Sequence, residues 1–324
     1  MGFFSSSLDY TEKHWYTPGG WQEMLLAGSA YRLGIFKILA DKPLTANELA
    51  DNINTDERAT DILLNALTAA GYLTIKDSRF SLTDAAVTQL IDENHPNFIG
   101  FSISHSLRLA ERWLTLPEVL VSGQPVAGDR FSETPEGFIK AMDVYAKKTA
   151  AQAVEYCLSQ NPQAKKVLDI GGATGTVSRL FAQRGLDSTL FDIPAVIELD
   201  QESLGDNPNI ELVTGDFNKS LPSGAFDIVY LGNITHIYSE EKNAALFKKI
   251  YKILNPGGII VILDFVRGLS PSAPLFAVNM LVNTHEGGTW TLDEFSGWLK
   301  AAGFGGIDYI DVKERDQQLI AGKK

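Results

Sequence analysis

A glycine-rich turn between a short apolar run and a helical run is the feature that most constrains how this chain folds. The turn has the sequence Gly-Gly-Ala-Thr-Gly at residues 171–175, the apolar run covers residues 167–170, and the helical run covers residues 177–183. Glycine accepts positive φ and lets a ligand approach the backbone closely. The order of strand, glycine turn and helix therefore predicts a nucleotide-binding βα unit.

The spacing of the glycines separates two classes of nucleotide. The dinucleotide fingerprint is Gly-x-Gly-x-x-Gly, and its second and third glycines would fall on Ala173 and Thr176. The turn instead has an acid, Asp169, two residues before its first glycine. A carboxylate at that point suits a ligand with an ammonium group better than a pyrophosphate. We therefore predict that the turn binds the methionine part of S-adenosylmethionine.

Two acids follow the next two predicted strands. Asp192 ends a strand seventeen residues after Gly175, and a carboxylate there can accept hydrogen bonds from both ribose hydroxyls. Asp216 and Phe217 follow the strand predicted at residues 210–213, so they can contact the adenine amino group and ring. Further strands are predicted at residues 226–231 and 259–265, with a turn between them at residues 255–258. Five elements in this order strengthen the cofactor prediction.

The pattern of apolar residues divides the chain into two parts. Up to about residue 155 the periodicity is mainly helical, with one apolar helix predicted at residues 21–39 and a capping box from Thr45 to Glu48. A further helix is predicted to begin at residues 55–56, and a two-stranded hairpin follows it at residues 72–83. Three helices and a hairpin indicate a winged helix. From residue 167 onward, apolar runs alternate with helical runs, which predicts an α/β fold with a parallel sheet and crossover helices.

The charge of the chain argues against a nucleic-acid partner. The formal net charge is −12, and an acidic chain repels phosphate backbones. Residues 31–90 hold six Lys or Arg and eight Asp or Glu, and residues 55–61, which would lead into a DNA groove, hold three acids and one base. We therefore favour subunit pairing over DNA binding for the predicted winged helix.

Several other sequence features bear on the cellular compartment of the protein and on whether it binds a membrane or a metal. No apolar run reaches the length that spans a membrane, and the first residues do not form a secretory signal pattern. The single cysteine, Cys157, permits no internal disulfide, so we expect a cytoplasmic protein without a membrane partner. His14, His95 and His105 have no acid or cysteine partners at metal-ligand spacing, so no metal is predicted.

The whole chain from about residue 31 onward resembles one known family. The resemblance is carried by residues 33–36, 44–50, 138–142, 169–175, 191–196, 215–217, 256–258 and 301–304. These segments are similar to those of the winged-helix, class I S-adenosylmethionine-dependent O-methyltransferases, which include plant caffeic-acid-type, hydroxyindole and bacterial natural-product enzymes. The resemblance implies a Rossmann-like domain with a mostly parallel seven-stranded sheet, S-adenosylmethionine as cofactor, and a homodimer joined through the N-terminal domain.

The resemblance and the patterns together predict the domains and the cofactor site. The expected parts are a helical winged-helix dimerisation domain at residues 1–95, a helical linker at 96–155 that contributes to the acceptor pocket, and a cofactor-binding catalytic domain at 156–324. The predicted cofactor-binding residues are Asp169, Gly171, Gly172, Ala173, Gly175, Asp192, Ile193, Gly215, Asp216, Phe217 and Asn233.

The segment after the fourth predicted strand suggests the catalytic group. His236 falls where the plant-type enzymes have their general base, and Asp264 falls on the first of two acids that flank it there. An ordinary histidine, with a pKa of about 6.5, can accept a proton from a phenol with a pKa of about 10. The simpler alternatives are that His236 packs in its loop and that Asp264 caps a strand end.

The family pattern is only partly kept around this histidine. The second acid would lie at residues 289–291, which are Thr-Trp-Thr, and a Lys or Arg of the plant-type enzymes is replaced by Gly232. Both departures weaken a direct transfer of plant phenol chemistry to this chain. The residues predicted to line the acceptor pocket, some of which could equally belong to the core, are Phe138, Met142, Phe276, Asn279, Met280, Asn283, His285 and Trp290.

We predict a methyltransferase that transfers the methyl group of S-adenosylmethionine to a hydroxyl of a small aromatic or polyketide-like acceptor. Transfer to carbon or nitrogen, or a non-methylating reaction on the same scaffold, is the alternative within the family. A ligand-sensing winged-helix regulator that binds DNA is the alternative from another class.

Overall fold

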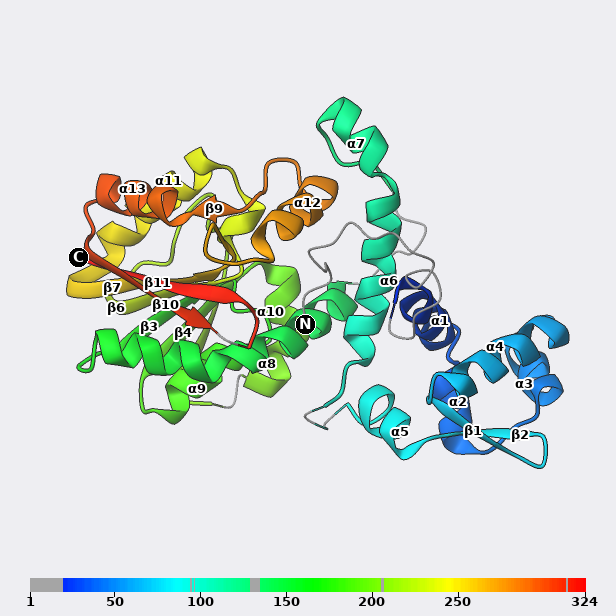
Figure 1. The fold of residues 1–324 in the computed structure, drawn as a ribbon. Helices are drawn as coiled ribbons and strands as arrows, with labels where there is room; N and C mark the ends of the chain where they lie inside the picture. Colours follow the sequence, from blue (N-terminus) through cyan, green and yellow to red (C-terminus); the bar gives the residue numbers. More distant parts are fainter. Residues whose placement is uncertain (1–19, 94, 96, 129–134, 205–206, 313) are drawn as a thin grey trace. The chain divides into compact units, whose positions relative to one another are not determined.

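The computed structural model describes residues 20–93, 95, 97–128, 135–204, 207–312 and 314–324 (Figure 1). Contacts within the chain divide it into two compact units, with the boundary between Ala110 and Glu111. The three-part division predicted from the sequence stays a prediction, and its first 19 residues lie outside the described ones. In the part of the chain that the structure describes, no helix is both long and apolar enough to span a bilayer.

The N-terminal unit consists of helices and one hairpin. Its elements are α1 (Trp21–Arg32), α2 (Ile35–Asp41), α3 (Ala46–Ile53), α4 (Glu57–Ala69), β1 (Leu73–Lys76), β2 (Arg79–Leu82), α5 (Asp84–Leu90) and the larger part of α6 (Gly100–Leu114). The capping box predicted at Thr45 and Glu48 is present, with both reciprocal hydrogen bonds formed. The β1–β2 turn places Asp77 and Ser78 at positive φ, as a two-residue hairpin of the I′ type requires.

The prediction of one helix over residues 21–39 is wrong. The segment forms α1 and α2, which are separated at Leu33 and Gly34 because Gly34 has a φ of 73°. That left-handed conformation is incompatible with a continuous right-handed helix. The apolar periodicity continues through Leu33 and Gly34, so the sequence pattern does not show the boundary between α1 and α2.

The C-terminal unit contains a seven-stranded sheet covered by helices. The strands are β3 (Lys166–Ile170), β4 (Asp187–Asp192), β5 (Ile210–Thr214), β6 (Phe226–Gly232), β7 (Leu254–Asp264), β10 (Gly305–Val312) and β11 (Gln317–Lys323). Their order is β10-β11-β7-β6-β3-β4-β5, with β3 to β7 parallel and β11 antiparallel to both neighbours. The predicted α/β fold with a mostly parallel sheet is confirmed.

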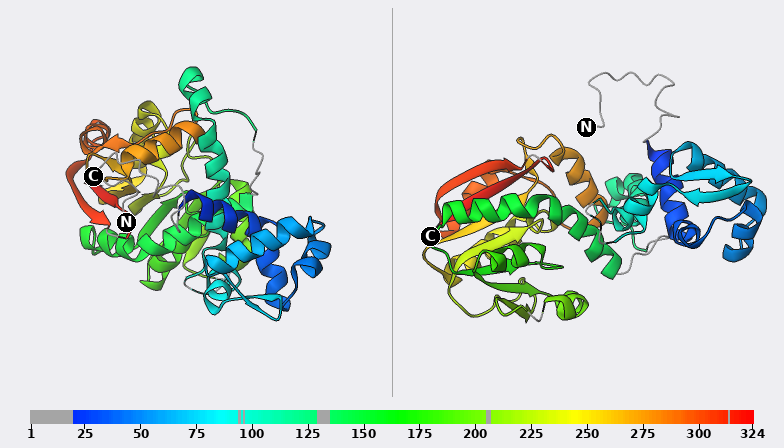
Figure 2. Two further views of the ribbon diagram at one scale, coloured as in Figure 1. Left: turned by 45° about the vertical axis from the view of Figure 1, so that its right-hand side comes forward. Right: turned by 90° about the horizontal axis from the view of Figure 1, so that it is seen from below.

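The remaining elements of this unit are mostly helical. They are α7 (Leu116–Ser122), α8 (Pro135–Gln160), α9 (Thr176–Gln183), α10 (Pro194–Leu204), the short 3₁₀ helix η2 (Thr235–Ile237), α11 (Glu240–Ile253), α12 (Ala273–Asn283), α13 (Leu292–Ala302) and the two short strands β8 (Val266–Arg267) and β9 (Trp290–Thr291). Helices α8 and α9 cover one face of the sheet, while α11 and α13 cover the other (Figure 1; further views in Figure 2).

Strand β6 shows why both faces of the sheet are apolar. Ile228 and Tyr230 pack toward α8 and α9, whereas Val229 and Leu231 pack toward α11 and α13. A strand covered by helices on both sides needs such a continuous apolar run. The charged side chain of β6, Asp227, lies near the start of the strand. The loops after the carboxyl ends of the parallel strands are where an open α/β sheet binds its ligands.

The turn predicted at residues 255–258 belongs to a strand in the structure. Strand β7 begins at Leu254 and continues through these residues, with an irregular register opposite β6. The Gly257 amide donates to the carbonyl of Lys324, the residue after β11, at 3.1 Å, so this segment pairs with the C-terminal end of the chain. Long-range pairing overrides the local turn signal here.

Candidate active site

The glycine turn after β3 adopts a backbone that only small residues accommodate. Gly171, Ala173 and Gly175 have φ values of 68°, 47° and 70°. A Cβ at Gly172 would lie 2.9 Å from Asp169 Oδ2 and 2.8 Å from a carbon of Leu190. The turn is therefore held tightly against β3 and β4, and its amides are placed at the carboxyl end of the sheet.

Asp169 lies beneath this turn rather than on its open side. Its side chain is 2% exposed, and Oδ2 accepts a hydrogen bond from Ser178 Oγ at 2.8 Å. Burial, with a smaller contribution from Asp192, raises the pKa of the Asp169 carboxyl to about 7. The contact with a ligand ammonium that we predict for this carboxyl stays a prediction.

Asp192 ties the turn to the end of β4. Its Oδ2 accepts from the Ala173 amide at 3.1 Å, and its Oδ1 accepts from the Ile193 amide at 2.8 Å. Burial raises the pKa of this carboxyl as well. The loop after β5 lies beside the end of β4, since the Gly215 amide donates to the Asp192 carbonyl at 2.9 Å. Four predicted cofactor residues therefore lie close together.

Residues 216–219 form the loop after β5, and a lysine that the sequence analysis missed holds this loop. Lys249 of α11 donates from Nζ to the carbonyls of Phe217, Asn218 and Lys219 at 3.2, 2.6 and 3.3 Å. The Phe217 ring meets Tyr238 edge-on, with ring centroids 5.4 Å apart. Lys249 thus places the predicted adenine contacts, although nothing in the local sequence of α11 indicates such a role.

A second residue that the sequence analysis missed is Asp143 of α8. Its Oδ1 accepts hydrogen bonds from the hydroxyls of Thr174 and Thr176, which flank Gly175. These bonds and its pairing with Lys147 outweigh the effect of burial and lower the pKa of Asp143. The carboxylate therefore anchors the glycine turn to α8.

The predicted catalytic pair is brought together in the structure. His236 lies in η2, directly after β6, and Asp264 ends the neighbouring strand β7. His236 Nδ1 and Asp264 Oδ1 are 2.8 Å apart, and both side chains are buried. A carboxylate only accepts hydrogen bonds, so Nδ1 donates to Asp264, and in the neutral imidazole Nε2 then presents its lone pair.

Asp264 is held by four donors. Its Oδ1 also accepts from the Phe265 amide at 2.8 Å, while Oδ2 accepts from the His236 amide at 3.0 Å and from the Thr235 hydroxyl. Three of these donors belong to the histidine loop, and the fourth is the amide of Phe265, the residue directly after Asp264. The carboxylate therefore fixes both the imidazole ring and the backbone that carries it.

The segment that lacks the second acid supports the histidine loop in a different way. Trp290 Nε1 donates to the Thr235 carbonyl at 3.1 Å, and the Gly288 amide donates to the His236 carbonyl at 2.9 Å. Asn243 of α11 adds a bond to the Thr235 carbonyl at 2.8 Å. These contacts restrain the backbone, whereas a second acid would contact the side chain.

The residues predicted to line the acceptor pocket fall into different environments. Phe276 lies edge-on to the His236 ring, with ring centroids 4.9 Å apart. It also packs against the Phe265 ring, with ring centroids 4.3 Å apart. Met280 is buried, and Met142 and Trp290 are partly buried. His285 and Phe138 are exposed. An aromatic ring of α12 therefore lies directly against the histidine.

Two asparagines form a polar patch on the same helix. Asn279 Oδ1 accepts from Trp113 Nε1 at 3.1 Å, and Asn283 Nδ2 donates to the Asn279 carbonyl at 2.8 Å. The Asn283 Oδ1 atom is buried, and no described residue donates to it. A buried amide oxygen without a donor suits a hydroxyl or amine of a ligand.

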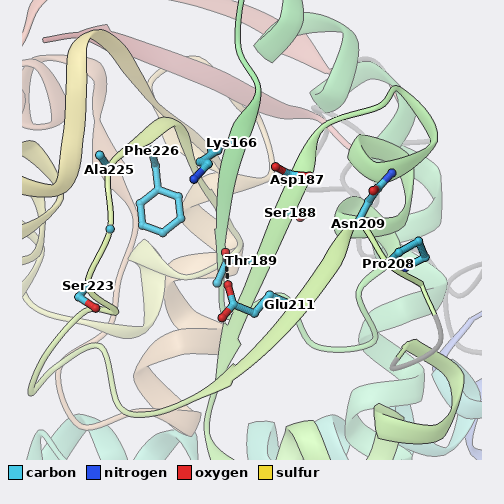
Figure 3. A pocket seen from close by; sticks show the side chains of 11 residues that line it. Lys166, Asp187, Ser188, Thr189, Pro208, Asn209, Glu211, Ser223, Ala225 and Phe226 are labelled. Atoms are coloured by element: carbon cyan, nitrogen blue, oxygen red, sulfur yellow. Dashed lines mark hydrogen bonds between the residues drawn. The ribbon is translucent and has the colours of Figure 1, made fainter.

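A cavity of about 390 Å³ lies at the opposite ends of the strands (Figure 3). Its lining includes Lys166 and Asp187, which begin β3 and β4, and also Ser188, Thr189 and Glu211. No predicted site residue lines it, and ligands of open α/β sheets bind beyond the carboxyl ends of the strands. We therefore do not assign the cofactor to this cavity.

Comparisons with known proteins find matches over most of this chain. A family model described as an O-methyltransferase domain matches residues 129–305, and one described as an O-methyltransferase dimerisation domain matches residues 23–92. The 8-O-methyl transferase TcmO of tetracenomycin polyketide synthesis from Streptomyces glaucescens is 28% identical, over 91% of each chain.

Two further relatives extend the likeness. The 3-hydroxy-5-methyl-1-naphthoate 3-O-methyltransferase from Streptomyces sahachiroi is 31% identical over 88% of this chain and 86% of its own. The solved structure of PigF with S-adenosylhomocysteine matches with a TM-score of 0.80 and 25% identity, over 94% of this chain and 96% of its own. A PigF protein from Serratia sp. (strain ATCC 39006) is described as an S-adenosyl-L-methionine-dependent methyl transferase.

Proposed function

This chain belongs to the O-methyltransferase family and is an S-adenosylmethionine-dependent methyltransferase, and on that premise we propose that it methylates a hydroxyl of a small aromatic or polyketide-like acceptor. The observation that carries the choice of a hydroxyl is the buried His236–Asp264 pair. Among the described residues, none occupies His236 Nε2, so this nitrogen is available to accept a proton.

The residues around the glycine turn fit the cofactor. The turn approaches β3 and β4 so closely that a Cβ at Gly172 would clash. The backbone amides of the turn would face the methionine part of the ligand, and Asp169, buried under the turn, would attract its ammonium group. Asp192, at the end of β4, would hold the ribose, and Asp216 with Phe217 would hold the adenine. When bound, S-adenosylmethionine supplies an electrophilic methyl group on a positively charged sulfur.

The chain's own contribution is to hold and deprotonate the acceptor. His236 Nε2 accepts the hydroxyl proton as the oxygen attacks, and the proton stays on the imidazole until solvent removes it. Asp264 stabilises the resulting imidazolium through Nδ1 and keeps the ring in one tautomer. Phe276 and Phe265 make the surroundings of the ring apolar, which strengthens the attraction between the charged groups.

The N-terminal unit is the proposed site of subunit pairing. The dimerisation-domain match covers residues 23–92, and the exposed apolar side chains of this unit include Leu33, Ile62 and Ile75. We expect a homodimer in solution, which light scattering coupled to gel filtration measures. A monomer at micromolar concentration would contradict this part of the proposal.

The state of Asp169 predicts how cofactor affinity depends on pH. The carboxyl has a pKa of about 7 and is neutral below that value, while a ligand ammonium favours the ionised form. Affinity for S-adenosylhomocysteine should therefore rise with pH, being about tenfold weaker near pH 6 than near pH 8. Titration calorimetry measures this, and the Asp169→Asn variant should bind weakly with little pH dependence. An unchanged pH dependence in that variant would assign the titration to another group.

The acceptor atom is tested by locating the transferred methyl group. We expect a methoxy resonance when a panel of hydroxyaromatic compounds is incubated with protein and S-adenosylmethionine carrying an isotope-labelled methyl group. Acceptors whose hydroxyl is already methylated should yield no product. A label found on carbon or nitrogen would replace the proposal with the alternative chemistry of the family.

A further inference from the structure

An arginine close to the catalytic pair has only aromatic rings as its side-chain contacts among the described residues. Arg315 lies in the turn between β10 and β11, and its guanidinium carbon is 4.3 Å from the ring centroid of Tyr145 and 5.7 Å from that of Phe265. Within the part of the chain that the structure describes, its side chain makes no hydrogen bond and no ion pair of 4.0 Å or less. The Arg315 side chain is only partly exposed to water, and this burial lowers the pKa of its guanidinium. A partly buried guanidinium with five N–H donors and no hydrogen-bond acceptor is stabilised by an anionic partner.

The nearby Asp264 does not serve as that partner. Both of its oxygens already accept two hydrogen bonds each, from the histidine loop and from Phe265. Asp264 acts on Arg315 only through electrostatic attraction at longer range. The positive charge of Arg315 therefore lies near the catalytic pair but forms no ion pair with Asp264.

The position of Arg315 is on the acceptor side of the sheet. Strand β11 pairs with β7, with Gln318 opposite Asp264, and β7 is separated by β6 from β3, after which the cofactor turn follows. Phe265 connects Arg315 to Phe276, which meets the His236 ring. A chain of aromatic contacts thus leads from the Arg315 guanidinium through Phe265 and Phe276 to the proposed base.

We propose that Arg315 binds a carboxylate of the acceptor, so that the substrate is a hydroxyaromatic acid. This inference rests on the proposed function and names its substrate class. The guanidinium carbon lies over the Tyr145 ring, a contact that uses none of the N–H groups as hydrogen-bond donors to oxygen. The planar fork of these N–H groups matches the two oxygens of a carboxylate. Because the aromatic rings would contact a flat acceptor, the carboxylate and the reacting hydroxyl would occupy the two ends of one planar ligand.

The same chemistry could come from the methionine carboxylate of the cofactor. The order of the strands favours the acceptor, since the predicted cofactor residues follow β3, β4, β5 and β6, whereas Arg315 precedes β11. The experiment therefore needs separate arms for the cofactor and the acceptor.

The test compares two probes of nearly equal shape, 6-hydroxy-2-naphthoate and 6-hydroxy-2-naphthamide. Binding of each probe to the protein saturated with S-adenosylhomocysteine is measured by calorimetry, for the wild type and for Arg315→Met and Arg315→Lys. The wild type should prefer the carboxylate, and Arg315→Met should weaken its binding about 10- to 100-fold while changing the amide less than about threefold. Arg315→Lys should lie between, because it keeps the charge without the planar fork.

A matched control removes a positive charge elsewhere. Arg184 is half exposed and pairs with Glu155 on the surface, so Arg184→Met should leave both probe affinities unchanged. S-adenosylhomocysteine affinity should also stay the same in Arg315→Met, which shows in addition that the variant is folded.

Two results would overturn the inference. If Arg315→Met loses S-adenosylhomocysteine affinity and keeps its probe preference, then the guanidinium binds the cofactor carboxylate. If the wild type binds the amide as well as the carboxylate, or binds neither, then Arg315 only stacks on Tyr145. Because the readout is binding, a protein that prefers the carboxylate but transfers no methyl group would refute the proposed function and leave this inference standing.

Discussion

Replacing His236 with alanine is expected to lower kcat about 100- to 10,000-fold at neutral pH, which corresponds to about 3–5 kcal/mol of transition-state stabilisation. The imidazole is the proposed acceptor of the hydroxyl proton, and without it a phenol must attack as the protonated form. KM for the acceptor and affinity for S-adenosylhomocysteine should change much less, since the ring contacts Phe276 rather than the predicted cofactor residues. Steady-state kinetics of S-adenosylhomocysteine release measures the split between kcat and KM.

The pH profile distinguishes a lost base from a damaged fold. A phenol acceptor ionises by itself near pH 10, so the deficit of His236→Ala should shrink steadily as pH rises above about 8. If the alanine variant is poorly folded, His236→Asn provides the same test, because its amide N–H can still donate to Asp264. His95→Ala is the control, since that ring lies in the N-terminal unit and accepts a bond from the Asn97 amide. Full activity of both His236 variants would remove the base role.

The parts of the fold that could be predicted from the sequence are those with a local physical cause. The glycine turn is predictable because its residues need positive φ, and the helix that begins after Thr45 is predictable because its capping box lies within four residues. The strand β6 is predictable because a run of buried apolar residues marks a strand that is covered on both faces. The resemblance to the family implied seven strands in total, and the order of the outer strands β10 and β11 was not predicted.

The parts that could not be predicted depend on contacts between distant segments. Asp143 reaches Thr174 across 31 residues, and Lys249 reaches Phe217 across 32 residues, so no local pattern marks either contact. Arg315 lies in a charged, ordinary-looking turn, and only the tertiary structure places it against Tyr145. For the same reason the lining of the acceptor pocket remains a set of predictions, although Phe276 does meet the proposed base.

Replacing Asp264 with asparagine is expected to lower kcat about 100- to 10,000-fold with little change in the affinity for S-adenosylhomocysteine. Three of the four bonds to this carboxylate come from N–H groups, namely the His236 ring, the His236 amide and the Phe265 amide. Whichever way the asparagine amide is turned, its NH₂ group faces at least one of these donors. If it faces the ring, Nδ1 must accept, the proton moves to Nε2, and the base is lost.

The matched control for this variant is Asp227→Asn, at the other end of the sheet. Asp227 also accepts backbone N–H bonds, from Lys165 and Lys166 at 2.9 and 3.0 Å, so its loss tests the cost of removing a multiply bonded carboxylate. We expect Asp227→Asn to lower Tm while keeping kcat, and Asp264→Asn to lower kcat far more than its change in Tm explains. Recovery of Asp264→Asn at high pH should parallel that of His236→Ala, because both variants lack a base and retain an acceptor that ionises. If Asp264→Asn keeps wild-type kcat while its Tm falls, the carboxylate only supports the loop, and the tautomer of His236 does not limit the reaction.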